Sequence, residues 1–186
     1  MSLDRVEENE LVERAKSGDH AAFEKLVELH QHEVFNLAVR LVGDRMLAED
    51  VVQEAFIRAW RALPGFRGEA AFGTWLYRIT ANTSFTHRAR KKVVTDLDTI
   101  PQPVEMHPAA NPVEHSETVL LRGALRHALA QLSEEHRRVV MLKDLEGWSH
   151  QEIAESLDIS VSLAKVRLHR GRKQLRFIWE GQHAAD

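Results

Sequence analysis

Apolar residues recur at intervals of three and four along most of the chain, the spacing that places side chains on one face of an α-helix. In residues 10–42 such a face is formed by Leu11, Ala15, Phe23, Leu26, Val27, Leu29, Val34, Leu37, Ala38 and Leu41. Ser17-Gly18-Asp19 interrupts it, because glycine ends helices readily and aspartate caps their starts. The stretch therefore predicts two helices with a short break between them.

Two further amphipathic stretches follow. Residues 44–63 keep the helical spacing until Pro64-Gly65 stops it, and a short loop leads into a third stretch at residues 73–92. Long alternation of apolar and polar residues, which is typical of β-strands, is missing from the sequence. Strands are therefore expected to contribute little.

Residues 93–117 differ in kind. They contain four of the five prolines, five acids and no Lys or Arg. Since proline cannot continue a helix and biases the preceding residue toward extended backbone, we expect a flexible linker here. The predicted fold class is all-α, with small helical domains at 1–92 and 118–180, joined by the acidic linker 93–117 and followed by a tail at 181–186.

Residues 147–176 carry two helices separated by a tight turn. Ser149 followed by Glu152 has the spacing of a capping box, which predicts a helix start. Asp158 to Ser160 forms the turn, since Asp tolerates left-handed backbone and Ser160 can cap the next helix.

The second helix of this pair has an apolar and a basic face. The apolar face is Val161, Ala164, Leu168, Gly171 and Leu175; the opposite face is Ser162, Val166, His169, Arg170 and Lys173, flanked by Lys165 and Arg167. Because a helix fits the major groove of DNA, this arrangement predicts a DNA-binding helix-turn-helix. The alternative is an amphipathic hairpin with an ordinary charged surface.

Charge is segregated along the chain, whose net value is −3. Residues 1–60 carry thirteen acids against seven cations, whereas residues 61–92 carry seven cations, one acid and five aromatics. Residues 159–186 carry six cations and two acids. Although charge runs are often plain solvated surface, the two basic stretches favour nucleic-acid contacts, and the acidic stretches are expected to face another partner.

Several function classes are excluded by composition and motifs. The chain has no cysteine, no apolar run near the roughly 20 residues of a membrane span, and an acidic N-terminus unlike a signal peptide. We therefore expect a cytoplasmic protein without membrane insertion. No phosphate-binding loop, nucleophile elbow or zinc spacing is present. The eleven histidines are expected on the surface, and neither a cofactor, a metal nor an enzymatic activity is predicted.

Three longer motifs resemble one known family. They are "AEDVVQEAFIRAW", "FRGEAAFGTWLYRITAN" and "HQEIAESLDISVSLAKVRLHRGRKQLR". Together they resemble bacterial RNA polymerase sigma factors of the two-domain extracytoplasmic-function (ECF) group, over most of residues 8–92 and 118–178. The resemblance implies a promoter-specificity subunit that binds core RNA polymerase, recognises −35 duplex DNA with the second domain, and recognises and melts −10 DNA with the first.

The resemblance also assigns residues to polymerase binding. It implies that one face of the second amphipathic helix docks on the clamp helices of the largest polymerase subunit, while the second domain meets the flap of the second-largest subunit. The docking residues are Asp50, Gln53, Glu54 and Arg58. Their spacing places them on one helix face. A solvated face is the alternative, and a metal or acid–base site built on Glu49, Asp50 and Glu54 is only weakly supported.

Contacts to the −10 element are implied in the basic, aromatic stretch, because rings stack on unpaired bases and cations meet phosphates. The matching residues are Arg58, Ala62, Phe66, Phe72, Trp75, Tyr77, Arg78 and Asn82. For Trp75 and Phe85 packing in the core is at least as strong an alternative. For Phe72, Arg78 and Asn82 we favour the DNA-binding role.

Contacts to the −35 element are implied on the last helix. Base contacts fall on Lys165, Val166, His169 and Arg170, with Arg170 the best candidate for a bidentate guanine contact. Phosphate contacts fall on Arg167 and Arg172, and Lys173 shares the face. The chain departs from frequent family residues at Val166, Leu163 and Thr86, which affects the expected promoter sequence more than the activity.

The resemblance leaves some alternatives open. The linker either threads the polymerase near its active-site cleft and RNA exit channel or is a plain tether. Apolar positions in residues 119–146 either pack internally or bind a partner, and the family suggests an anti-sigma factor. A dimeric helix-turn-helix regulator, and a sigma-like protein without promoter activity, are the competing functions.

Overall fold

The computed structural model describes residues 5–97 and 116–183. The chain divides into two compact units, one on each side of the segment between these ranges. Every regular element in the described ranges is helical. The predicted all-α class with two helical domains is therefore confirmed.

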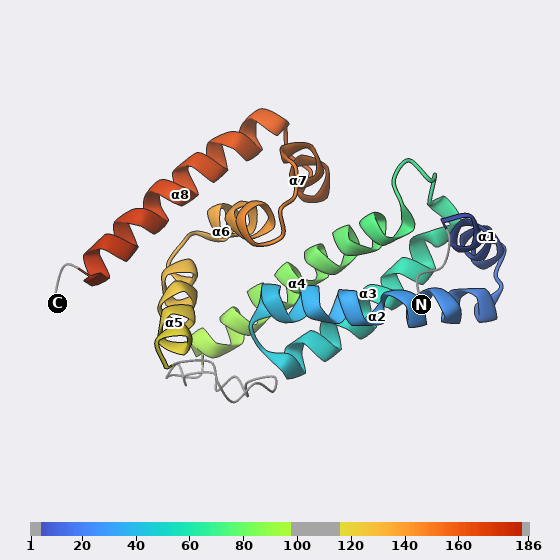
Figure 1. Cartoon of the computed structure of the whole chain (residues 1–186), viewed down its shortest axis with the longest axis horizontal. Helices are drawn as coiled ribbons and strands as arrows, with labels where there is room; N and C mark the ends of the chain where they lie inside the picture. The colour runs from blue at the N-terminus through green and yellow to red at the C-terminus, as the bar shows by residue number, and fades with distance from the viewer. Residues whose placement is uncertain (1–4, 98–115, 184–186) are drawn as a thin grey trace. The chain divides into compact units, whose positions relative to one another are not determined.

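The first unit contains four long helices: α1 (Arg5–Lys16), α2 (His20–Val42), α3 (Arg45–Ala62) and α4 (Phe72–Leu97). A short 3-10 turn, η1 (Leu63–Gly65), follows α3 at the predicted Pro-Gly stop. Figure 1 shows α2, α3 and α4 lying alongside one another, and each of these helices contacts the other two. Their shared core includes Leu26, Val34, Phe56, Phe72 and Leu76.

Local chemistry sets the helix ends of this unit. Gly18 has a φ of 93°, and the Asp19 side chain accepts a hydrogen bond from the Ala22 N–H, so the predicted break and cap are confirmed. Asp44 caps α3 in the same way by accepting from the Leu47 N–H. The two caps separate α2 from its neighbours and allow the chain to reverse at each end.

The second unit contains α5 (Ser116–Ala130), α6 (Glu134–Val140), a π-helical turn η2 (Met141–Leu145), α7 (His150–Leu157) and α8 (Val161–His183). Helices α6 and α7 pack against α8 (Figure 1). A Cβ atom built on Gly171 of α8 would lie 2.7 Å from the Val140 Cγ2 atom of α6. A larger residue at this position would therefore force α6 or its side chains to shift.

Helices extend into both ends of the predicted linker. Residues 93–97 belong to α4 and residues 116–117 to α5. The segment 98–115, on which the expectation of an extended linker rests, lies outside the described residues. Helix α8 likewise continues to His183, into the stretch that we expected to be a tail.

Candidate nucleic-acid and partner-protein interfaces

The α7–α8 pair has the local structure of a helix-turn-helix. Ser149 and Glu152 form a reciprocal capping box, in which the Glu152 N–H donates to the Ser149 Oγ and the Ser149 N–H to the Glu152 carboxylate. Asp158 adopts left-handed backbone with a φ of 51°. Ser160 Oγ accepts from the Leu163 N–H at 3.1 Å and caps α8. All three predicted features of the turn are confirmed.

The outer face of α8 is open to solvent. Val166 is 43% exposed, and the polar members of the predicted base-contact set, with Lys173, are exposed as well. These polar side chains are Lys165, His169, Arg170 and Lys173. Within residues 5–97 and 116–183, none of the four forms an ion pair. The opposite face packs inward through Ala164, Leu168 and Gly171. The face can therefore meet a DNA groove without first breaking an internal ion pair.

The two predicted phosphate contacts of α8 are arranged differently. Arg167 forms an ion pair with Glu135 of α6 at 2.9 Å and is only 19% exposed in its side chain. Arg172 Nε donates to Asp144 of η2 at 3.0 Å. Both arginines hold α8 against the preceding helices. To bind a DNA phosphate, each arginine must either contact the phosphate and its acid together or release the acid.

An aromatic cluster marks the start of α4. The Phe66 and Trp75 ring centroids are 4.9 Å apart, and the Phe72 and Trp75 centroids 5.6 Å apart. Phe66 and Trp75 are half-buried, but Phe72 is only 2% exposed and belongs to the core. Phe72, for which the DNA-binding role is favoured, is thus a core residue against which Phe66 and Trp75 pack, and its contact with DNA stays a prediction. Phe85 is buried, in line with the core alternative.

Polar neighbours occupy other residues of the predicted −10 set. The Tyr77 hydroxyl donates a hydrogen bond to Glu33 of α2, and burial together with this carboxylate raises the pKa of Tyr77. Arg78 and Asn82 are half-buried on α4, one helical turn apart, and Ala62 is exposed at the end of α3. These residues thus lie on α4 and at the end of α3, with Tyr77 engaged in an internal hydrogen bond.

One histidine near this cluster was not anticipated. His30 of α2 pairs with Glu8 of α1 at 2.8 Å, and its ring centroid lies 5.4 Å from that of Phe72. The expectation that the histidines are plain surface residues is therefore wrong for His30. Its neighbours come from α1 and α4, so no local pattern in the sequence could have indicated the contact.

The predicted polymerase-binding residues on α3 include both exposed side chains and side chains held by internal hydrogen bonds. Asp50 and Gln53 are exposed. Glu54, in contrast, accepts from Arg58 Nε at 2.7 Å through Oε1 and from His87 Nε2 of α4 at 2.5 Å through Oε2. The hydrogen bond from His87, with that from Arg58, lowers the pKa of Glu54.

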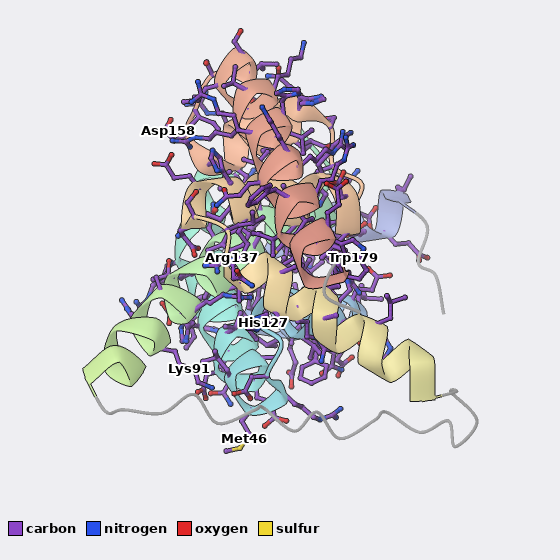
Figure 2. All side chains as sticks on the ribbon, turned by 90° about the vertical axis from the view of Figure 1, so that its left-hand side faces the viewer. Met46, Lys91, His127, Arg137, Asp158 and Trp179 are labelled. Atoms are coloured by element: carbon purple, nitrogen blue, oxygen red, sulfur yellow. The ribbon has the colours of Figure 1, made fainter. Side chains whose placement is uncertain are left out.

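Two apolar side chains extend the exposed α3 face. Met46 is 80% exposed and projects away from the ribbon in Figure 2, and Ile57 is also exposed. The positions 46, 50, 53 and 57 follow helical spacing, so Met46 and Ile57 flank Asp50 and Gln53 on one stripe. Sequence reasoning did not single out the two apolar residues, although their spacing was visible.

The second unit has an apolar groove of about 490 Å³ between α5 and the end of α8. It is lined by the apolar side chains of Leu121, Leu125, Leu175 and Trp179 and by Arg172 and Arg176. Other apolar residues of the same segment, including Leu129, Leu132 and Val139, are buried. Residues 119–146 thus contain apolar side chains that pack internally, and the binding of a partner by the exposed ones stays a prediction.

Other types of site are not seen in the described ranges. No group of three or more His, Cys, Asp or Glu side chains there is placed to hold a metal ion. None of the helices described is both long enough and apolar enough to cross a membrane.

Comparison with known proteins shows the family to which the chain belongs. The family model for sigma-70 region 2 matches residues 26–93, and that for sigma-70 region 4 matches residues 122–175. The RNA polymerase sigma-H factor of Pseudomonas aeruginosa is 38% identical over 181 residues, covering 93% of this chain and 94% of that protein. The ECF RNA polymerase sigma-E factor of Escherichia coli is 39% identical over 175 residues, covering 89% of this chain and 90% of that protein.

Solved structures agree with the sequence relatives. CnrH in complex with the cytosolic domain of CnrY has a TM-score of 0.63 and 27% identity, over 96% of this chain and 97% of that chain. The fold of the sigma factor RpoE, in complex with the anti-sigma factor NepR from Bartonella quintana, matches at a TM-score of 0.63 and 24% identity, over 85% of this chain and 96% of that chain. The chain therefore belongs to the extracytoplasmic-function sigma factors, with sigma-70 region 2 in its first unit and region 4 in its second.

Proposed function

We propose that this sigma factor, which serves transcription initiation, reads −35 duplex DNA with α8 and holds melted −10 DNA against α4 and the preceding loop. The observation that carries the proposal is the open outer face of α8, where Lys165, His169 and Arg170 are exposed on a helix whose start is capped by Ser160. Bidentate guanidinium contacts to guanine suit Arg170, and the half-buried Phe66 and Trp75 rings suit an unpaired base.

The proposed polymerase contacts use both units. On α3, exposed Asp50 and Gln53 meet the clamp helices of the largest subunit, and Arg58, held by Glu54, lies further along the same helix. In the second unit, the apolar groove between α5 and α8 accepts an apolar helix of the flap of the second-largest subunit. Sigma factors are non-enzymatic polymerase subunits, so the chain has no catalytic residues to assign.

Regulation by an anti-sigma factor is part of the proposal. The support is the similarity to CnrH, which is bound by the cytosolic domain of CnrY. We also propose a cytoplasmic location, because the chain would act on promoter DNA together with RNA polymerase. An anti-sigma factor can block polymerase binding by covering the surfaces that contact the polymerase. We therefore expect an anti-sigma factor to cover the exposed α3 stripe and the groove of the second unit.

The test is reconstitution with core polymerase that lacks any sigma factor. Purified chain and core are added to genomic fragments, and the transcript starts are mapped. We expect initiation at sites that share one −35 and one −10 sequence. Absence of core binding, or initiation without a shared sequence, would contradict the proposal. Binding to symmetric half-sites as a dimer without core would favour a stand-alone regulator instead.

A further inference from the structure

A histidine hydrogen bond and a lysine ion pair join α4 to α3 and its N-cap in the first unit. Glu54 of α3 pairs with His87 of α4 at 2.5 Å, and the α3 N-cap Asp44 pairs with Lys91 of α4 at 2.6 Å. The guanidinium of Arg88 adds a hydrogen bond to the Leu41 carbonyl at 3.0 Å. The second half of α4 is thus held by side chains whose hydrogen-bond donors are engaged inside the unit.

The Glu54 carboxylate is divided between two helices. One oxygen receives Arg58 from the same helix, and the other receives His87 from α4. A carboxylate can only accept, so His87 Nε2 must carry the proton in this bond. The Glu54 side chain is 30% exposed and that of His87 only 16%, which places the histidine behind the acid rather than on the α3 surface.

We propose that His87 is a positioning residue for polymerase binding, which fixes Glu54 and thereby holds Arg58 in place on the α3 face without touching the polymerase itself. The inference rests on the proposed docking of that face. Removing His87 frees one carboxylate oxygen and lets the Glu54–Arg58 pair adopt other rotamers. The face must then be ordered again when the polymerase binds, and that ordering costs affinity.

The experiment measures binding of full-length variants to core polymerase. His87→Phe keeps a planar ring but removes the N–H donor, and His87→Gln keeps a donor. We expect H87F to weaken core binding about five-fold, as typical coupling between contacting side chains allows, and H87Q to stay within about two-fold of the wild type. In a Glu54→Ala background, H87F should have no further effect.

A matched control separates positioning from general loosening of the unit. Lys91→Met removes the neighbouring ion pair to α4 but touches no residue of the α3 face, so we expect lower thermal stability with unchanged core affinity. Affinities are compared for the folded fraction, measured by circular dichroism. If H87F does not fold, His87→Met, a flexible apolar side chain without a donor, takes its place with the same expectation.

The outcomes distinguish the two levels of the argument. If Asp50→Ala with Gln53→Ala weakens core binding but H87F does not, the role of His87 is refuted while the docking face stands. Equal losses from H87F and K91M, or additive losses from H87F and E54A, also overturn it. If neither H87F nor the Asp50 and Gln53 variant weakens binding, both the inference and the proposed docking face are wrong.

Discussion

Helices α8 and α4 are the proposed DNA-binding helices of their units, and they use their polar side chains differently. On α8, Lys165, His169 and Arg170 are exposed, while Arg167 and Arg172 carry the ion pairs to the preceding helices. On α4, the hydroxyl of Tyr77, the imidazole of His87 and the ammonium group of Lys91 are engaged by acids of the same unit.

This difference matches the two kinds of DNA that the helices are proposed to contact. A duplex presents its base edges in the major groove, so an exposed, rigid helix face is sufficient to read it. Melted DNA must first be unpaired at a cost of a few kcal/mol per base, which an isolated small unit hardly supplies. We therefore expect that α4 contacts DNA productively only in the holoenzyme, whereas α8 needs no rearrangement of its outer face.

The largest expected effect is on the free energy of unfolding, and it compares a buried with an exposed residue of the predicted DNA-binding sets. Phe72→Ala removes a ring that packs against Phe66, Trp75 and His30, so it should destabilise the protein by about 3–5 kcal/mol. Val166→Ala on α8 should change the free energy of unfolding by less than about 0.5 kcal/mol. Urea denaturation compares the two; an F72A protein as stable as the wild type would show that Phe72 is no core residue.

A second prediction concerns the rigidity of α8. Gly171→Ala places a methyl group against Val140, which should cost about 1–3 kcal/mol through overpacking. Gly123→Ala on α5, where no atom lies within 4 Å of the added carbon, is the matched control. Because alanine favours helix, this control should be neutral or more stable by up to about 1 kcal/mol. Thermal unfolding of both variants checks the contrast, and equal melting temperatures would refute the close α6–α8 approach.

A third prediction compares two arginines one turn apart. Arg167→Ala should lower stability by up to about 1 kcal/mol, because the largely covered Arg167 side chain loses its packing together with its ion pair to the exposed Glu135. Arg170→Ala should leave stability unchanged within about 0.5 kcal/mol, because Arg170 is exposed. A double-mutant cycle with Glu135→Ala isolates the Arg167 pair. No coupling between Arg167 and Glu135 would instead support Arg167 as a free phosphate contact.

The smallest effect is a pH dependence in the first unit. The hydrogen bond from Lys91, with that from the Leu47 N–H, lowers the pKa of Asp44 below its usual value. A lowered folded-state pKa stabilises the fold above the unfolded value, and this contribution is lost as the pH falls below about 4. Asp44→Asn keeps the cap but loses the pair, so it should cost up to about 1 kcal/mol at neutral pH and progressively less in acid. A pH-independent cost would argue against the pair.

The helices and the outer face of α8 could be predicted from the sequence because their causes are local. Capping pairs such as Ser149 and Glu152 lie three residues apart, and helical spacing assigns Arg170 to the face opposite Ala164. The ends of the long helices were predicted less accurately. Residues 93–97 continue α4, since the prolines that stop a helix come only later.

Contacts between helices could not be predicted in the same way. His87 and Glu54 are 33 residues apart, and only the packing of α4 on α3 brings them together. The burial of Phe72 has a different cause. Aromatic residues among cations suit a packed core and an unpaired base equally well, so only the arrangement of Phe66, Phe72 and Trp75 decides which ring is inside.

Footprinting of the reconstituted holoenzyme on one promoter tests the central comparison most directly, with wild-type chain and Arg170→Ala side by side. Protection of the −35 duplex reports on α8, and permanganate reactivity of unpaired thymines reports on −10 melting. With R170A we predict about ten-fold weaker discrimination of the −35 sequence, as the loss of one bidentate base contact implies, but unchanged core binding and −10 melting once the complex has formed. Lys25→Ala, an exposed lysine outside the proposed interfaces, controls for lost charge. Equal loss of −35 protection, core binding and −10 melting in R170A would contradict the assignment of separate DNA contacts to the two units.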